Sequence, residues 1–232
     1  MKKLILMLML IPMVSLAQKI ELNANNHVMF RGVVNGKSVA KASRQLLYLS
    51  LKAKPDATIY LILDSPGGSV YAGLNFVRTL AAIPQNVECI AIRAHSMAHH
   101  FLQACPGKRH IIFNGMSMAH RASGSFRGTF NKGRVEQQLE LWTEIVQSME
   151  KVNAKRMGLS LEEYQAYAKD EYWCYGMSCK NKNFVDEISS LSCSQQLLQQ
   201  TTKEIRHTFF GKYELSFSKC PMISYPKIKR IK

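Results

Sequence analysis

Apolar positions occur in blocks along the chain, and the blocks differ in the period at which they repeat. Apolar runs typical of buried strands predict four strands, at 58–63, 87–92, 109–113 and 116–120. Apolar residues at helical spacing predict a helix over 39–53 and a much longer one over 135–156, and the segment 20–34 is predicted to be extended. The alternation of strand-like and helix-like blocks predicts an α/β fold.

Two sharp turns connect predicted strands to predicted helices. The first, at 65–68, has the sequence Ser-Pro-Gly-Gly, and the second covers 94–97. Helices are predicted to follow them, from Ser69 to about Ala82 and from Ser96 to Ala104. The start of a helix exposes backbone N–H groups that suit anions, so the amides of Gly68 and Met97 are candidate donors to an oxyanion. Ser96 is a candidate nucleophile at the second turn, where a serine also fits the ordinary role of an N-cap.

The first seventeen residues have the pattern of a cleavable export signal. Lys2 and Lys3 precede an apolar run, and Ser15 and Ala17 supply the small residues that a signal peptidase requires. The run is about half of the roughly 20 residues that a membrane-spanning helix needs. We therefore predict a signal peptide at 1–17, an exported chain that is periplasmic or secreted, and no membrane span after cleavage.

Composition and charge limit the kind of protein. The 232 residues suit one domain, and 47% hydrophobic residues exclude disorder as the main state. The net charge is +15, or +13 once the signal removes two lysines, and basic residues gather at the C-terminal end. We expect a main domain over 18–192 and a basic C-terminal extension over 193–232. No nucleic-acid partner is expected, because the interleaved basic and aromatic residues of such modules are missing.

The six cysteines all follow the signal, and an even number in an exported chain permits disulfides. Cys89 and Cys105 lie in apolar segments, where buried thiols are expected. The last four cysteines allow three pairings, of which Cys174–Cys179 with Cys193–Cys220 is preferred. Neither pair has the CxxC spacing of a zinc site.

Several motifs in order along the chain resemble the Clp protease proteolytic subunit, ClpP. They are Leu61-Ile62-Leu63-Asp64-Ser65-Pro66-Gly67-Gly68-Ser69-Val70-Tyr71-Ala72-Gly73, Ser96-Met97, Lys108-Arg109, Met118-Ala119-His120, Gly158-Leu159-Ser160-Leu161-Glu162 and Phe184-Val185-Asp186-Glu187-Ile188. The resemblance implies a ClpP/crotonase-like fold in a single domain, with the long helix projecting against a neighbouring subunit. It also implies a serine-type endopeptidase that hydrolyses peptide bonds without a cofactor.

The resemblance also assigns roles to individual residues. Ser96 is expected to be the nucleophile, His120 the general base, and Glu171 the acid that orients the imidazole, with Asp170 as its rival. The family has an Asp at this third position.

Gly68 and Met97 are expected to supply the oxyanion-hole amides. The surroundings of the nucleophile depart from the family pattern, which has a Gly a few positions before the Ser and another just after the Met, whereas His95 and His99 add bulk here.

Two alternatives use the same residues differently. In the first, the chain is an inactive ClpP-like scaffold that acts as a binding module. In the second, His95 and His99, at i and i+4, form a metal site together with His100 and His120. No carboxylate completes an HExxH pattern for the metal site.

The resemblance further implies partners. Peptides or unfolded proteins are the expected substrates, and a homo-oligomeric ring is the expected assembly. An ATP-driven unfoldase is expected only if the chain is cytoplasmic, because an exported chain meets no ATP.

Overall fold

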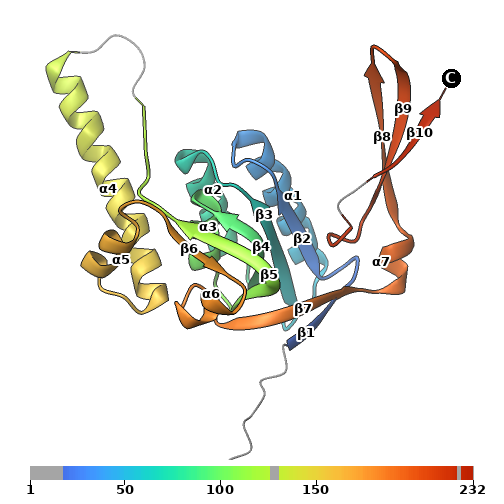
Figure 1. Cartoon of the computed structure of the whole chain (residues 1–232), viewed down its shortest axis with the longest axis horizontal. Helices are drawn as coiled ribbons and strands as arrows, with labels where there is room; N and C mark the ends of the chain where they lie inside the picture. Colours follow the sequence, from blue (N-terminus) through green and yellow to red (C-terminus); the bar gives the residue numbers. More distant parts are fainter. Residues whose placement is uncertain (1–17, 126–130, 224–225, 232) are drawn as a thin grey trace, which may run out of the picture.

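The computed structural model describes residues 18–125, 131–223 and 226–231, so the predicted signal peptide at 1–17 lies outside the described residues. Seven strands form one sheet in the order β1-β7-β5-β4-β3-β2, with β6 paired to β5 (Figure 1). They are β1 (Gln18–Leu22), β2 (His27–Arg31), β3 (Thr58–Ser65), β4 (Asn86–His95), β5 (Arg109–Ala119), β6 (Tyr172–Tyr175) and β7 (Glu187–Cys193). Only the β5–β6 pair of this sheet is antiparallel. The predicted α/β class with a ClpP/crotonase-like single domain is confirmed.

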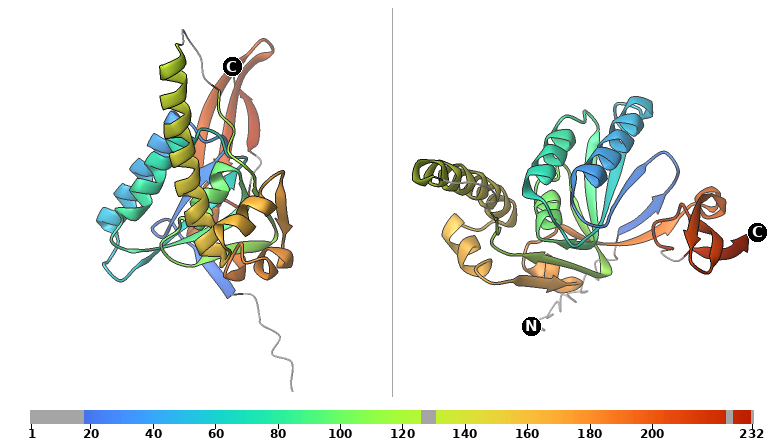
Figure 2. Two further views of the ribbon diagram at one scale, coloured as in Figure 1. Left: turned by 90° about the vertical axis from the view of Figure 1, so that its left-hand side faces the viewer. Right: turned by 90° about the horizontal axis from the view of Figure 1, so that it is seen from above.

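Seven helices accompany the strands in the described residues. They are α1 (Gly36–Lys52), α2 (Val70–Ala81), α3 (Met97–Gln103), α4 (Lys132–Met157), α5 (Leu161–Tyr167), α6 (Met177–Asn181) and α7 (Gln195–Gln199). Side-chain caps begin five of them, at Asn35, Ser69, Asn131, Ser160 and Ser194, each accepting a hydrogen bond from an N–H of the first turn. The predicted long helix is α4, which extends away from the sheet beside α5 (Figure 2).

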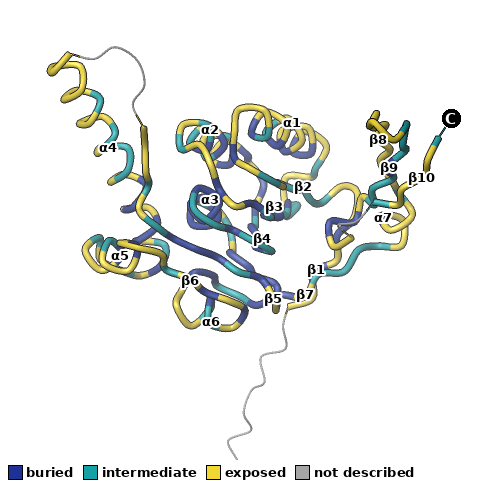
Figure 3. The backbone as a smooth tube through the Cα atoms, turned by 45° about the horizontal axis from the view of Figure 1, so that its top comes forward, coloured by how far each residue is buried: buried dark blue, intermediate teal, exposed yellow. Residues whose placement is uncertain are grey.

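The two faces of the sheet bury different side chains, as the two-residue period of a strand requires. Leu61 and Leu63 of β3 face α1–α3 in the larger core, where three phenylalanine rings pack with centroids 4.9 to 5.3 Å apart. Ile62 belongs to a smaller core on the other face, which includes Leu197 of α7. Burial is concentrated along β3, β4 and β5, whereas the outer part of α4 is exposed (Figure 3).

Two strand predictions differ from the structure. The segment 20–34 is not one extended run, because an asparagine-rich turn at 23–26 separates β1 from β2, and these strands lie at opposite ends of the sheet. The predicted strands 109–113 and 116–120 are a single strand, β5. Its first part pairs with β7 and its last part with β6, so each half has a partner that keeps it extended.

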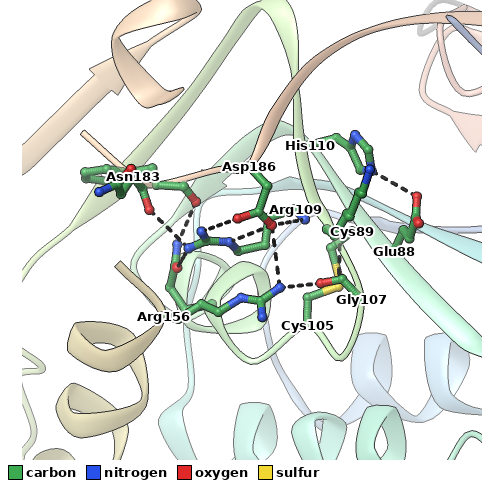
Figure 4. A network of polar contacts seen from close by, with 12 residues as sticks. Glu88, Cys89, Cys105, Gly107, Arg109, His110, Arg156, Asn183 and Asp186 are labelled. Atoms are coloured by element: carbon green, nitrogen blue, oxygen red, sulfur yellow. Dashed lines mark hydrogen bonds and ion pairs between the residues drawn. A yellow bond between two sulfur atoms is a disulfide. The ribbon is translucent and has the colours of Figure 1, made fainter. Parts of the chain in front are cut away.

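A network around Arg109 ties the sheet to α3 and α4 (Figure 4). The guanidinium is almost fully buried and binds Asp186 at two points, with Nη2–Oδ1 at 2.6 Å and Nε–Oδ2 at 3.2 Å. It also donates to Gln103 of α3, while Arg156 of α4 contacts Asp186 at 3.5 Å. Burial acts to raise the pKa of Asp186, but the hydrogen bonds and charge of Arg109 and the charge of Arg156 outweigh it and lower that pKa.

Three disulfides are present, and two of them are the preferred pairs Cys174–Cys179 and Cys193–Cys220. The expectation of buried free thiols at Cys89 and Cys105 is wrong, because these two form the third disulfide. The chain reverses direction through α3, and this brings Cys105 back beside β4, with the two Cα atoms 6.0 Å apart.

The C-terminal residues form a second, three-stranded antiparallel sheet of β8 (Thr201–Thr208), β9 (Gly211–Ser218) and β10 (Lys227–Ile231). Every residue of β8 is exposed, and the sheet extends from the body on the side opposite α4 (Figure 1). Within the described ranges, no helix is both long enough and apolar enough to cross a membrane.

Candidate active site

The ends of three neighbouring parallel strands bring the predicted residues together. Ser96 directly follows β4, His120 directly follows β5, and the Gly67-Gly68 pair follows β3 after one proline. Parallel neighbours end at the same edge of a sheet, which is where ligand sites of open α/β sheets lie. The Nε2 atom of His120 lies 2.7 Å from Oγ of Ser96, a hydrogen-bond distance suited to proton transfer.

The backbone of Ser96 is held in an unusual conformation. Its φ of 54° lies in the left-handed region, which costs energy for any residue with a Cβ. Its N–H donates to the carbonyl of Met118 at 2.9 Å, which ties the turn to β5. The hydroxyl makes no capping hydrogen bond to α3, so Ser96 is directed to His120 rather than used as a side-chain cap.

Glycines leave room beside the backbone amides of this turn. A Cβ on Gly67 would lie 2.6 Å from the carbonyl oxygen of His95 and 2.9 Å from the backbone nitrogen of Met97. As the first residue of α3, Met97 has an N–H without an intrahelical acceptor. Gly68 is fixed by its neighbours, because the N–H of Val34 donates to Gly67 and the carbonyl of Val34 accepts from Ser69. Both predicted oxyanion donors therefore border the nucleophile.

Glu171, the third predicted residue, lies near His120 along the backbone, but among the described residues its side chain makes no hydrogen bond to the imidazole. Antiparallel pairing sets Tyr172 opposite Ala119. Glu171, just before β6, and His120, just after β5, therefore lie at the same end of the β5–β6 pair. The Glu171 carboxylate accepts instead from Nε1 of Trp173 at 2.8 Å. Across the described ranges, neither Glu171 nor Asp170 makes a hydrogen bond to His120. The structure thus brings two of the three predicted residues into contact.

His95, which departs from the family pattern, directly precedes the nucleophile in the chain. Its ring packs edge-on against Trp173, with centroids 4.8 Å apart. Burial first, and then the charge of Arg93, lower the pKa of His95, and nearby Glu171 and Asp64 oppose this only in part. A neutral imidazole is therefore favoured at this position.

The four histidines of the metal hypothesis have different partners. His99 contacts Ser117 and His100 contacts Asn153, while His120 contacts Ser96. In the part of the chain that the structure describes, no group of three or more metal-binding side chains occurs.

A cavity of about 90 Å³ adjoins the serine and histidine. It is lined by Gly68, Val70, Ser96, Met97, His99, His100, Ala119, His120, Ala122, Ser123, Val146, Met149, Glu150, Asn153 and Tyr164. The part of this lining that α4 contributes was not predicted from the sequence. Its signal was the pair Glu150 and Asn153, two polar residues at helical spacing next to the apolar Val146 and Met149.

Comparisons with known proteins agree with the motifs. Residues 15–191 match the family model described as Clp protease. The chain is 28% identical over 165 residues to the ATP-dependent Clp protease proteolytic subunit 1 of Frankia casuarinae, covering 70% of this chain and 76% of that protein. It is 30% identical over 149 residues to the subunit 1 of Leifsonia xyli subsp. xyli, covering 63% and 74%. It is also 30% identical over 165 residues to the proteolytic subunit of Streptococcus pneumoniae strain Hungary19A-6, covering 69% and 83%.

Proposed function

The chain belongs to the Clp protease family, and from this premise we propose that it is a serine-type endopeptidase in which Ser96 and His120 cleave peptide bonds. The observation that carries the proposal is the 2.7 Å contact between Ser96 Oγ and His120 Nε2 at a strained turn. A hydroxyl within reach of a base is the arrangement that serine nucleophiles need. The amides of Gly68 and Met97 beside it add the means to stabilise an oxyanion.

The reaction follows from these positions. His120 Nε2 takes the hydroxyl proton while Ser96 Oγ attacks the substrate carbonyl, and the resulting oxyanion accepts hydrogen bonds from the amides of Gly68 and Met97. Each such donor contributes about 3 kcal/mol in comparable acyl-transfer enzymes. His120 then passes the proton to the leaving amine, and water releases the acyl group from Ser96 by the same steps.

The test of this function is labelling with a fluorophosphonate, which reacts with activated serines, followed by peptide mapping. We expect one adduct, on Ser96, and loss of both labelling and peptide hydrolysis by about 10⁴-fold or more in Ser96→Ala. Ser148→Ala, at an exposed position of α4, is the matched control and keeps wild-type labelling. A folded wild-type protein without an adduct supports the inactive scaffold instead.

We assign Glu171 as the residue that orients His120, with its carboxylate moving from Trp173 to Nδ1 of the imidazole. The support is its position at the same end of the β5–β6 pair as His120. Glu171→Gln is expected to lower kcat by about 10⁴-fold, as loss of the orienting acid does in other serine peptidases, while Asp170→Asn keeps activity. The opposite result transfers the role to Asp170.

We further propose that copies of the chain assemble into a ring through α4. This helix extends from the body (Figure 1) and carries exposed apolar side chains at Val135 and Leu139, four residues apart on one face, and at Leu141 on another face. Exposed apolar patches of this kind mark interaction sites. Sedimentation should give a multiple of the subunit mass, and Leu139→Glu with Leu141→Glu should reduce it to one subunit. A wild-type protein that sediments as a single subunit contradicts the ring.

Export is proposed for the mature chain, with peptides or unfolded proteins as substrates and no ATP-driven unfoldase. Three disulfides support this, because such bonds persist in oxidising compartments. Fusion of residues 1–30 to a reporter that works only after export is the test. An inactive reporter would place the chain in the cytoplasm and restore the unfoldase as a partner.

A further inference from the structure

A carboxylate lies in the wall of the cavity beside the serine without a cation to balance it. Glu150 is 8% exposed, and its Oε2 accepts a hydrogen bond from Nε2 of Gln165 at 2.7 Å. No lysine, arginine or histidine pairs with Glu150 among the described residues. A buried charge is costly unless a partner neutralises it, so this position fits a cationic ligand.

His100 adds a hydrogen-bond acceptor to the same cavity. Its Nδ1 lies 2.7 Å from Oδ1 of Asn153, whose amide nitrogen donates to the hydroxyl of Tyr164. The Asn153 oxygen is an acceptor, so the ring proton of neutral His100 is on Nδ1 and its Nε2 carries a lone pair. Burial lowers the pKa of His100, which keeps this ring neutral.

His99 offers a second imidazole acceptor by the same logic. Ser117 Oγ donates its only proton to the carbonyl of Ala94 at 2.8 Å, so Nδ1 of His99 must donate to Oγ at 3.0 Å. Its Nε2 is buried and has no partner among the described residues. Burial is the main cause that lowers the pKa of His99 to about 3, and the charge of Arg109 acts in the same direction.

We propose that this cavity binds the side chain of the substrate residue whose carbonyl is attacked, and that Glu150 makes it select lysine or arginine. The inference rests on the proposed function. The cavity shares a wall with Ser96, Gly68 and His120, so the side chain nearest the reacting carbonyl enters it. An ammonium or guanidinium group carries several N–H donors and a positive charge, and it therefore matches an anionic oxygen and two imidazole lone pairs. A volume of about 90 Å³ exceeds what one water needs.

The experiment compares peptides that differ only at that residue, with arginine, citrulline, lysine or leucine. Citrulline has nearly the shape of arginine but no charge, so the arginine-to-citrulline ratio of kcat/KM isolates the role of the carboxylate. We expect a ratio of at least about 100 in the wild type, falling at least about 30-fold in Glu150→Gln. Glu144→Gln, at an exposed position of the same helix, should leave the ratio unchanged.

A measurement on the wild type avoids any dependence on the folding of a variant. p-Aminobenzamidine, which carries a cationic amidinium, should inhibit hydrolysis competitively, whereas neutral benzamide at the same concentration should not. Equal inhibition by the two compounds, or equal cleavage of the arginine and leucine peptides, overturns the inference.

Fluorophosphonate labelling separates this inference from the proposed function, because the probe reports the activated serine whatever the peptide. An adduct on Ser96 together with equal cleavage of all four peptides refutes the basic pocket alone. No adduct and no cleavage refutes both.

Discussion

Replacing Gly67 with alanine tests whether the site depends on the open space next to the nucleophile. The new Cβ would lie 2.6 Å from Ser96 Cβ and from the carbonyl oxygen of His95, and 2.9 Å from the nitrogen of Met97. Ordinary contacts begin near 3.4 Å, so the two segments must separate by about 0.8 Å, the difference between 3.4 and 2.6 Å. The methyl group would also occupy the space in front of the Met97 N–H.

The expected loss follows from that displacement. Misplacing reacting groups by about 1 Å costs on the order of 10²-fold in rate, which corresponds to about 2.7 kcal/mol of transition-state stabilisation. A non-glycine residue at the φ of +89° also destabilises the folded state, by about 1–2 kcal/mol. Gly67→Ala should therefore lose about 100-fold in both labelling rate and kcat/KM while remaining folded.

Gly32→Ala is the matched control. Gly32 has nearly the same φ, +90°, but a Cβ there meets nothing within 4 Å. Gly67→Ala should lose more unfolding free energy in urea than Gly32→Ala, because only its Cβ meets neighbouring backbone atoms, and only Gly67→Ala should lose activity. Wild-type labelling of Ser96 in folded Gly67→Ala would refute the dependence of the site on the open space beside Gly67.

Two further predictions concern stability. The Cys89–Cys105 bridge closes a loop with a sequence separation of 16, so Cys89→Ala with Cys105→Ala should lower the unfolding free energy by about 3 kcal/mol; urea curves that coincide with the wild type would contradict this. The pKa of His99 is about 3 in the folded chain against 6.5 ordinarily, so the unfolded chain binds more protons between these values. The unfolding free energy should fall as the pH drops from 6.5 towards 3, by up to about 1.4 kcal/mol per pH unit more in the wild type than in His99→Gln. Urea unfolding of both proteins at several pH values measures this, and the same pH dependence of the unfolding free energy in the two would disprove it.

The parts of the site that the sequence predicted are those governed by local rules. Ser96 and His120 each follow an apolar strand, and the edge at which parallel strands end is fixed by topology. The Gly67-Gly68 pair stands out because few other residues tolerate such turns.

The missed features depend on contacts between distant segments. Glu150 and Asn153 interrupt an apolar face of the long helix, but which surface that face meets depends on the packing of α4 beside α3 and α5. The Cys89–Cys105 bridge required the exact reversal of the chain through α3, which no spacing rule provides. The side-chain partner of Glu171 likewise depended on where Trp173 lies in β6.

The Cys193–Cys220 bridge changes what happens when the C-terminal sheet is cut. The bridge encloses α7, β8 and β9, and β8 exposes Lys203 and Arg206 to any peptidase that prefers basic residues. A cut there leaves both fragments covalently attached, so the nicked protein keeps its tail and gains only one water in mass. Intact and nicked forms would migrate together on a gel without reductant and separate once the bridge is reduced. Removal of the C-terminal fragment therefore needs two steps, cleavage of the backbone in β8 and then reduction of the Cys193–Cys220 disulfide.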